Sequence, residues 1–342
     1  MRRLLPRGRE GGAAGAMWEV VGLPLPPALR QALVDGGFTA AEELGRAGPV
    51  ALAEEAGISQ EDALYACKVA GECLGRAGGG DGALPIVTAA SLRGDGLRGA
   101  IATRAGPIDA VLRGGIPQGV ITELCGVPGA GKTQLAMQLA VNVQLPRRMG
   151  GLDGRALYLD TEGSFTPERV QAIAEAALEG EEASGSSGLS AESLLEGVSY
   201  QRIHSALEQL NLVEALPSMC RQDPRLRLVV LDSLVFHLRH TEGEASLRRH
   251  ALMTMYQMLS CVARECNVAV LVVNQFTTRL GKDGARLVPV SGETWGHIPT
   301  VRLFVMSGEA GNYLQVNKSP WHPQQVAFFS ITRKGIEPAK PF

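Results

Sequence analysis

The stretch GVPGAGKTQL, which begins at Gly126, restricts the possible folds more than any other part of the sequence. It matches the pattern G-x-x-x-x-G-K-[ST], with Gly126, Gly131, Lys132 and Thr133 at the fixed positions. Glycines let such a loop turn successive backbone N–H groups inward, where they can hold phosphate oxygens. The apolar run GVITEL precedes the loop and the helical pattern TQLAMQLAVNVQL follows it. The sequence therefore predicts a phosphate-binding loop between a strand and a helix.

Apolar runs alternate with helical patterns over the chain after about residue 100. The strand-like runs are RALYLDT, LRLVVLDSL and NVAVLVVNQ, and the helical patterns are TPERVQAIAEAALE and ALMTMYQMLSCVAREC. Apolar strands separated by helices predict a parallel sheet covered on both faces. TVRLFVMSGEAGNYLQVNKS and QQVAFFSIT predict three further strands, which we expect to form an antiparallel extension of the sheet. We interpret residues 180–197, which are polar and low in complexity, as a mobile insertion.

Short helical patterns come before this α/β region. LPPALRQALVDGG predicts a helix that ends at Gly36 and Gly37, TAAEELGRAG one that Thr39 caps and that ends at glycine, and GISQEDALYACKVAGECL one that Ser59 caps. The glycines of GRAGGGDGALP predict a linker near residue 80. We expect a disordered tail (1–20), a helical domain (21–76), a linker with a candidate subunit-contact segment (77–99) and an α/β core (100–342).

Composition narrows the classes of protein. The formal net charge of the 342 residues is −2, which excludes a uniformly basic surface, so any nucleic-acid binding must come from local patches. The six cysteines form no CxxC pair and no zinc spacing, and we expect them to be reduced, in an intracellular protein. No apolar run has transmembrane length. The first 17 residues lack the apolar part of a secretory signal, which leaves a weak transit peptide or a disordered tail, with Met17 as an alternative start.

The loop and one strand end predict a nucleotide and metal site. Lys132 is expected to reach the β- and γ-phosphates and Thr133 to ligate Mg²⁺. Asp232 ends the apolar strand in LVVLDS, where an aspartate would bind Mg²⁺ through water. Taken alone, such an aspartate would more simply cap a helix. The candidate nucleotide ligands of the loop are Gly126, Val127, Pro128, Gly129, Ala130, Gly131, Lys132 and Thr133.

Two further strand ends carry polar residues. YLDTEGSF places Asp160 and Glu162 after a strand, and we expect Glu162 to orient the attacking water, the alternative being a surface glutamate in a turn. VVNQFTT ends a third strand with Asn274 and Gln275. A buried amide there either senses the γ-phosphate or caps a turn, and spacing alone does not decide between the two.

Taken in order, GVPGAGKTQL, DTEGSFTPER, LVVLDS, VVNQFTT and GETWGH resemble the RecA-type core of eukaryotic and archaeal strand-exchange recombinases. The helical region, with its GISQEDA turn, resembles their helix-hairpin-helix-like domain, and the similarity covers about residues 20–335. TELCGVPGAGKTQLAMQLAVNVQLP, DTEGSF, VPVSGETWGH and NKSP look most like one branch, the C-type paralogues. The resemblance implies a RecA-like ATPase core that uses ATP and Mg²⁺.

The resemblance also implies roles for individual residues. Lys132, Glu162 and Asp232 would be catalytic, together with Gln275 as the γ-phosphate sensor, and Arg169 would stack on adenine. Residues 236–250 and 276–297 fall at the family's two DNA-binding loops, where basic side chains contact phosphates. The candidate DNA-binding residues are Arg239, Arg248, Arg249, Arg279, Lys282 and Arg286. Without the resemblance, these six would be read as solvated surface charges.

Two positions depart from the recombinase pattern. The linker segment IVTAASL has Ile86 and Ala89 where the recombinases use Phe-x-x-Ala to plug into a neighbouring subunit, which favours pairing with a different subunit. Lys318 in NKSP stands where the recombinases have an aspartate near the ATP of the subunit interface. We hypothesise that Lys318 binds at this nucleotide site and replaces a monovalent cation there.

The implied function is that of a DNA-dependent ATPase in homologous recombination and double-strand break repair. It would bind single-stranded or branched DNA, assemble with other recombinase paralogues as a hetero-oligomer, and promote recombinase loading and junction processing. The recombinase itself is a further candidate partner, and no membrane role is expected. The chain ends at GIEPAKPF without a basic targeting tail, so a nuclear location, with the cytoplasm as a second one, is inferred from the role alone. The alternatives are an ATP-gated scaffold with negligible turnover and, less favoured, a small-molecule kinase.

Overall fold

The chain divides into two compact units, Met1–Gly94 and Asp95–Phe342, each of which is described by itself. The computed structural model describes residues 19–23, 25–77, 99–179, 188–239, 245–281, 284–290, 298–309 and 311–339. Most of the predicted tail and linker, including Ile86 and Ala89, lies outside these residues. The domain boundaries expected from the sequence therefore stay predictions. Among the helices that are described, none is long and apolar enough to cross a membrane.

The first unit is a small bundle of helices with its own core. It contains a 3-10 turn η1 (Val20–Gly22) and the helices α1 (Pro27–Asp35), α2 (Ala41–Ala56) and α3 (Gln60–Ala77). The side chains that fill its centre are apolar and almost fully buried, and they include Val20, Leu23, Leu33, Leu44, Leu52, Ala63, Ala66 and Ala70. The alanines of α3 recur at helical spacing, so α2 packs closely against that face.

The ends of these helices differ in part from the expectation. Ser59 caps α3 as predicted, because its hydroxyl accepts the backbone N–H three residues later at 3.0 Å. Thr39 was the wrong cap for α2: Ala40 precedes the helix, and the Glu43 carboxylate accepts the N–H groups of Thr39 and Ala40 at 2.7 and 3.0 Å. The helical backbone does end at a glycine, as predicted: Gly48 has a non-helical conformation (φ 72°), and a second helical stretch of α2 begins at the following Pro49.

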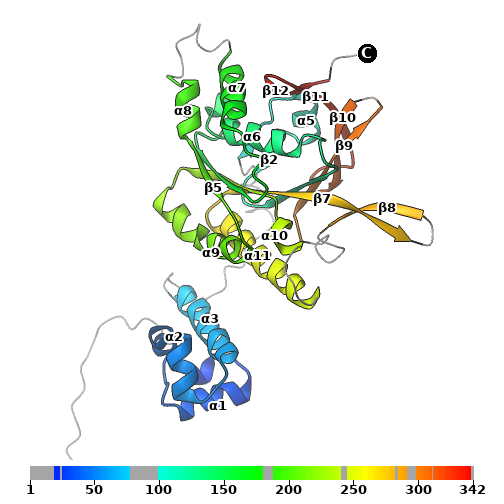
Figure 1. Ribbon diagram of the computed structural model, residues 1–342. Coiled ribbons are helices and arrows are strands. Elements are labelled where there is room, and N and C mark those ends of the chain that lie inside the picture. The colour runs from blue at the N-terminus through cyan, green and yellow to red at the C-terminus, as the bar shows by residue number, and fades with distance from the viewer. Residues whose placement is uncertain are drawn as a thin grey trace, which may run out of the picture. The chain divides into compact units, whose positions relative to one another are not determined.

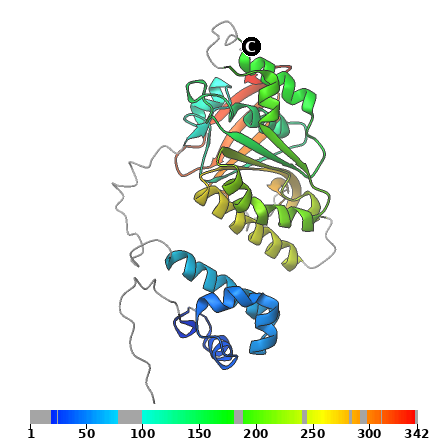
Figure 2. The ribbon, with the colours of Figure 1, turned by 90° about the vertical axis from the view of Figure 1, so that its left-hand side faces the viewer.

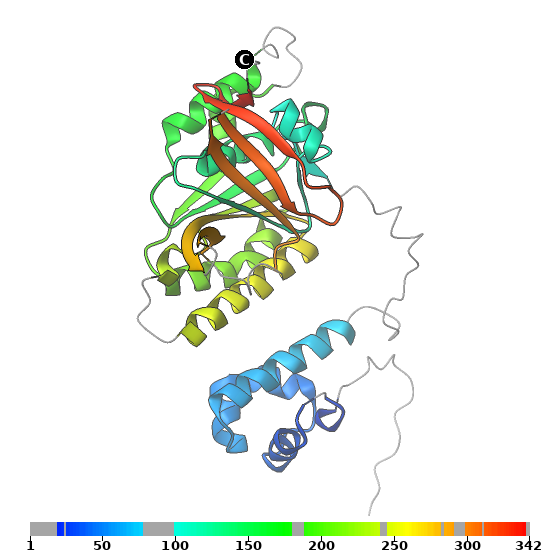
Figure 3. The ribbon, with the colours of Figure 1, turned by 90° about the vertical axis from the view of Figure 1, so that its right-hand side faces the viewer.

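The second unit is built on a ten-stranded sheet with the order β12-β11-β10-β9-β3-β7-β6-β4-β5, and β8 pairs with β7 (Figure 1). Strands β3, β7, β6, β4, β5 and β9 run parallel, whereas β9 to β12 pair antiparallel (Figure 3), so the predicted parallel sheet with an antiparallel extension is confirmed. The strands are β3 (Ile121–Gly126), β4 (Arg155–Asp160), β5 (Val198–Arg202), β6 (Leu226–Asp232), β7 (Ala269–Gly281), β8 (Gly284–Pro289), β9 (Val301–Gly308), β10 (Gly311–Lys318), β11 (Val326–Thr332) and β12 (Gly335–Pro338). A separate pair consists of β1 (Ala100–Ile101) and β2 (Ile116–Pro117).

Helices cover the sheet on both faces, as Figures 1 and 2 show. On one face lie α5 (Gly106–Val111), α6 (Lys132–Asn142), η2 (Arg147–Met149), α7 (Pro167–Leu178) and α8 (Ala191–Glu196). On the other lie α9 (Ala206–Gln222), α10 (Phe236–Arg239) and α11 (Ala245–Glu265). Each layer closes its own apolar cluster, because alternate side chains of the central strands point to opposite faces. The carboxyl ends of the parallel strands thus meet at one edge, where ligands bind in such sheets.

Several parts of this unit were not anticipated. Strand β5 and helix α9 were not predicted at all. The predicted mobile insertion is wrong for α8, because Ser190 caps this helix and Leu194 is fully buried, while residues 180–187 lie outside the described part. Strand β7 also runs on past Gln275 and forms a hairpin with β8 inside the segment assigned to the second DNA-binding loop.

Candidate nucleotide site

The loop from Gly126 to Thr133 joins β3 to α6, as the motif requires. All six residues of β3 are buried, so the strand holds the start of the loop rigidly inside the sheet. At Gly126 an added Cβ would lie 2.1 Å from the carbonyl oxygen of Val305 on β9, and only glycine allows this approach. Gly131 has φ 102°, a left-handed conformation that directs the chain into α6. The loop therefore meets the helix N-terminus where the helix dipole favours anions.

Lys132 is buried although it carries a charge. Its ammonium donates to the carbonyl oxygen of Val127 at 2.8 Å, so the side chain folds back across its own loop. Burial lowers the pKa of Lys132, while the carboxylates of Asp232 and Glu162 oppose that shift. A buried ammonium bonded to a neutral carbonyl is well suited to exchange that bond for a phosphate oxygen.

Asp232 lies next to the loop at the end of β6 and is 2% exposed. One of its carboxylate oxygens, Oδ2, accepts the Thr133 hydroxyl at 2.8 Å and the Tyr158 hydroxyl at 2.8 Å. Burial raises the pKa of Asp232 to about 6, and these two hydrogen bonds oppose the rise. The structure thus brings together two predicted residues, Thr133 and Asp232, and adds Tyr158, which sequence reasoning missed.

Glu162 meets Gln275 at the neighbouring strand ends. Its Oε1 accepts the Gln275 amide at 2.8 Å and the Ser233 hydroxyl at 2.7 Å. Ser233 directly follows Asp232 and was also missed, although its place after a strand-end aspartate was visible in the sequence. Three strands therefore deliver Glu162, Ser233 and Gln275 to one point beside the loop. An amide bonded directly to a carboxylate can respond to anything that moves that carboxylate.

Asn274, the neighbour of Gln275, has different contacts. Its side-chain amide donates to Glu123 Oε1 at 2.8 Å, and its oxygen accepts the Gln275 backbone N–H at 2.8 Å. Glu123 is fully buried and also accepts Arg302 Nε at 2.5 Å. Asn274 therefore joins a buried ion pair inside the sheet, whereas Gln275 reaches the catalytic candidate.

Lys318 ends β10, where the register pairs it with Arg302. Burial lowers the pKa of Lys318, the nearby Arg302 lowers it further, and Glu123 opposes both. The buried Glu123–Arg302 pair thus contributes to the electrostatic surroundings of Lys318. The assignment of Lys318 to a nucleotide at a subunit interface stays a prediction.

Arg169 lies on α7 and ties three segments together beside the loop. Its Nε donates to Gln134 in the first turn of α6 at 2.5 Å. Its two terminal nitrogens donate to the carbonyl oxygens of Thr332 and Arg333 at 2.6 Å each. Arginine bonded by its edge in this way keeps its planar face for stacking, so the geometry is compatible with the adenine contact that the resemblance implied.

The candidate DNA-binding residues are placed by their backbone alone. Arg239 ends α10, Arg248 and Arg249 lie in the first turns of α11, and Lys282 lies outside the described residues. In the β7–β8 hairpin the register sets Arg279 directly opposite Arg286.

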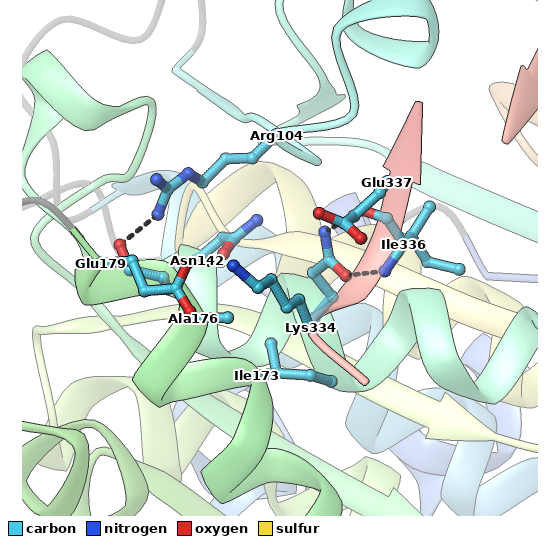
Figure 4. A pocket seen from close by; sticks show the side chains of 10 residues that line it. Arg104, Asn142, Ile173, Ala176, Glu179, Lys334, Ile336 and Glu337 are labelled. Atoms are coloured by element: carbon cyan, nitrogen blue, oxygen red, sulfur yellow. Dashed lines mark hydrogen bonds and ion pairs between the residues drawn. The ribbon is translucent and has the colours of Figure 1, made fainter. Parts of the chain in front are cut away.

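A separate hollow of about 530 Å³, including its open mouth, lies between α6, α7 and β12 (Figure 4). Its polar lining side chains are bonded within the protein. Arg104 donates to the Ala177 carbonyl, Lys334 pairs with Glu179, and Gln138 exchanges two hydrogen bonds with the backbone of Ile336. These bonds join the helices to the last strand, and the hollow lies apart from the loop and its strand ends.

Comparison with known proteins agrees with this geometry. Residues 99–339 match the family described as Rad51. The chain is 36% identical over 337 residues to the "DNA repair protein RAD51 homolog 3" of Cricetulus griseus, covering 94% of this chain and 92% of that protein. It is also 34% identical over 246 residues to a protein of the same name from Dictyostelium discoideum, covering 69% of this chain and 65% of that one.

Proposed function

The chain belongs to the Rad51 family, and on that premise we propose that it is an ATP-dependent, DNA-binding recombinase paralogue that acts in homologous recombination and double-strand break repair. One observation carries the proposal. The candidate water-orienting carboxylate, Glu162, is bonded to the candidate sensor, Gln275, beside the Lys132 loop. A phosphate loop alone would fit many proteins. The hydrogen bond between Glu162 and Gln275 supplies a route by which the presence or loss of the γ-phosphate can affect another part of the chain.

The residues of the site fit magnesium and ATP. Thr133 and Asp232 offer oxygen ligands, which magnesium prefers, and they already lie within hydrogen-bond distance of each other. Magnesium would neutralise phosphate charge there, while Lys132 would bind the β- and γ-phosphates. Glu162 would orient the attacking water, and Arg169 would contact the base. The match to the Rad51 family over residues 99–339 supports ATP binding with a metal ion.

Gln275 also connects the site to the candidate DNA interface. It lies on β7, which continues without a break into the hairpin that carries Arg279 and Arg286. A shift of Glu162 on loss of the γ-phosphate would pull directly on this strand. ATP would then favour the bound arrangement of the hairpin and hydrolysis its release. Single-stranded or branched DNA is the ligand that this hairpin would contact through phosphates.

The relatives' name places them in DNA repair, and we extend that role to this chain. It would assemble with other recombinase paralogues, promote loading of the recombinase and processing of junctions, and work in the nucleus. The departures in the linker favour unlike subunits over a homopolymer. In such an assembly Lys318 would bring a fixed positive charge to a neighbour's nucleotide.

The charge of Lys318 predicts that ATP turnover of the assembled complex does not depend on potassium. A tethered ammonium would occupy the place of a bound monovalent cation, so exchange of potassium for a large organic cation should leave the rate unchanged within about twofold. Lys318→Asp should create a requirement for potassium. Clear potassium activation of the unaltered protein would overturn the assignment.

The proposal is tested with Lys132→Ala in a complex purified with candidate paralogues. We expect loss of DNA-stimulated ATP hydrolysis and of repair, because the phosphates lose their buried cation. Lys68→Ala, which removes an exposed lysine of α3, is the matched control. Hydrolysis is measured at two salt concentrations, since phosphate-dominated DNA binding weakens with salt. Absence of DNA stimulation, or repair that survives Lys132→Ala, would instead support the scaffold without useful turnover.

A further inference from the structure

Asp160, at the end of β4, has an unusual number of hydrogen-bond donors. The side chain is fully buried, and its oxygens accept the backbone N–H groups of Glu162, Gly163 and Phe165 at 3.0, 2.7 and 3.2 Å. These three groups belong to the turn that carries Glu162. A carboxylate that accepts several N–H groups fixes the path of the backbone between them. Asp160 therefore determines where the turn of Glu162 lies.

Two more donors reach Asp160 from β5, the last strand of the sheet. The Tyr200 hydroxyl donates to Oδ2 at 3.3 Å, and an Arg202 terminal nitrogen donates to Oδ1 at 3.2 Å. They are two residues apart on one strand and so lie on the same face of the sheet. Arg202 is the cation that balances the buried charge of Asp160. Its guanidinium also lies against the turn, because a Cβ on Gly163 would come within 3.1 Å of it.

The ring of Tyr200 forms a second connection to the site. It stacks on Phe165 with centroids 4.8 Å apart, and Phe165 packs on Tyr158 at 4.8 Å. Tyr158 in turn donates to Asp232. Both routes start on β5, where Tyr200 is 44% exposed, and both end at a residue of the nucleotide site.

We infer that Tyr200 and Arg202 are positioning residues: from the edge strand β5 they hold, through Asp160, the turn that places Glu162 for hydrolysis. The inference rests on the proposed function. Without Arg202 the carboxylate of Asp160 keeps its N–H donors but loses the cation that balances it, so the turn loosens. A displacement of a reacting group by about 1 Å costs on the order of a hundredfold in rate. The loop that binds the nucleotide is not part of this arrangement.

The experiment separates positioning from general stability by comparing two ligands. ADP with magnesium is held by the loop and measures its integrity. ADP with aluminium fluoride mimics the transferring phosphoryl group, and its extra affinity depends on a correctly placed Glu162. Both affinities are measured by competition with a fluorescent ADP, together with thermal unfolding and kcat and KM for ATP. The variants are Arg202→Met, Arg202→Lys and Tyr200→Phe, with Ser199→Ala as the control on the opposite, exposed face of β5.

For Arg202→Met we expect kcat and the extra affinity for the aluminium fluoride complex to fall together by about tenfold, the usual worth of a hydrogen bond to a charged group. ADP affinity and KM should change less than about twofold. Arg202→Lys should recover part of the loss, Tyr200→Phe should show a smaller one of about threefold, and Ser199→Ala none.

Two results would overturn the inference and leave the proposed function intact. One is an Arg202→Met protein that still distinguishes the two ligands as well as the unaltered protein does. The other is a parallel loss of ADP affinity and thermal stability, which would indicate a structural role alone. An unaltered protein that binds ADP equally with and without aluminium fluoride would overturn the proposed hydrolysis, and the inference with it.

Discussion

At the scale of single residues, the site depends on hydroxyl groups that support charged ones. Tyr158 and Thr133 share one oxygen of Asp232, and Ser233 shares one oxygen of Glu162 with Gln275. A hydroxyl that stays neutral keeps its proton, so it can donate to a carboxylate and orient it. Burial and the nearby Asp232 carboxylate raise the pKa of Tyr158, which keeps this phenol protonated.

We predict that Tyr158→Phe weakens the metal-dependent part of nucleotide binding by about tenfold, because loss of a group that orients a metal's carboxylate typically has this size of effect. Binding of ADP in the presence of a chelator should stay unchanged, since the loop holds it. Titration of fluorescent ADP with and without magnesium measures both quantities. Tyr65→Phe, at an exposed tyrosine of the helical unit, is the control. Equal weakening in both conditions would contradict the assignment.

The raised pKa of Asp232 predicts a pH dependence of the metal-free protein. The folded pKa is about 6 and the ordinary value is 3.8, so the folded state keeps a proton that the unfolded chain has released. This contribution to stability is complete below pH 4 and is lost as the pH rises through 6, and it amounts to at most about 3 kcal/mol. Denaturant unfolding from pH 4 to 7 should show a decline that is absent in Asp232→Asn. If the difference in the free energy of unfolding between the two proteins does not change with pH, the raised pKa of Asp232 is contradicted.

At the scale of secondary structure, local signals decide which elements can be read from sequence. The apolar strands β3, β4, β6 and β7 are continuous runs, because they are buried on both faces of the sheet. Strand β5 (VSYQR) lies at the edge, with its three central residues exposed, and it carries neither an apolar run nor clear alternation. Helix α9 contains Pro217, and a proline in a sequence usually indicates the end of a helix.

The failure to predict β5 explains why Tyr200 and Arg202 were missing from the predicted site. The loop, Glu162, Asp232 and Gln275 could be predicted, because each follows a run of apolar residues that is recognisable by itself. Tyr200 and Arg202 act on Asp160 only through the pairing of β4 with β5. No spacing in the sequence encodes that pairing. Register between distant strands is set by tertiary packing, so positioning residues on an edge strand are beyond local reasoning.

The start of α9 gives a prediction about an element. The Ser205 hydroxyl accepts the backbone N–H of Glu208 at 3.1 Å, and the Glu208 carboxylate accepts the N–H of His204 at 2.8 Å. Ser205→Ala should therefore lower the free energy of unfolding by about 1 kcal/mol, whereas Ser205→Asp should preserve the cap. Denaturant unfolding measures both. An alanine variant as stable as the unaltered protein would show that packing of α9 alone holds its first turn.

At the scale of the whole molecule, the net charge of −2 means that DNA can be attracted only to particular places. We propose the β7–β8 hairpin as one such place, since its register sets Arg279 opposite Arg286 and it is continuous with the strand of Gln275. The nucleotide site and the hairpin thus share a single strand. Under the proposed function, hydrolysis would alter the affinity for DNA through this hairpin.

The salt dependence of DNA binding tests this arrangement. Each arginine that contacts a phosphate of single-stranded DNA contributes about 0.7 to the slope of log affinity against log salt. Arg279→Ala and Arg286→Ala should therefore each lower the slope by about that amount and weaken binding of all sequences alike. Arg221→Ala, an exposed arginine at the end of α9, should leave the slope unchanged. The hairpin is continuous with Gln275. In Gln275→Ala the difference in DNA affinity between the ATP and ADP states should therefore shrink. The salt slope of this variant, measured with ATP, should stay unchanged. A slope unaltered by both hairpin substitutions would place the phosphate contacts on another element. The strand that links Gln275 to the hairpin would then have no role in DNA binding.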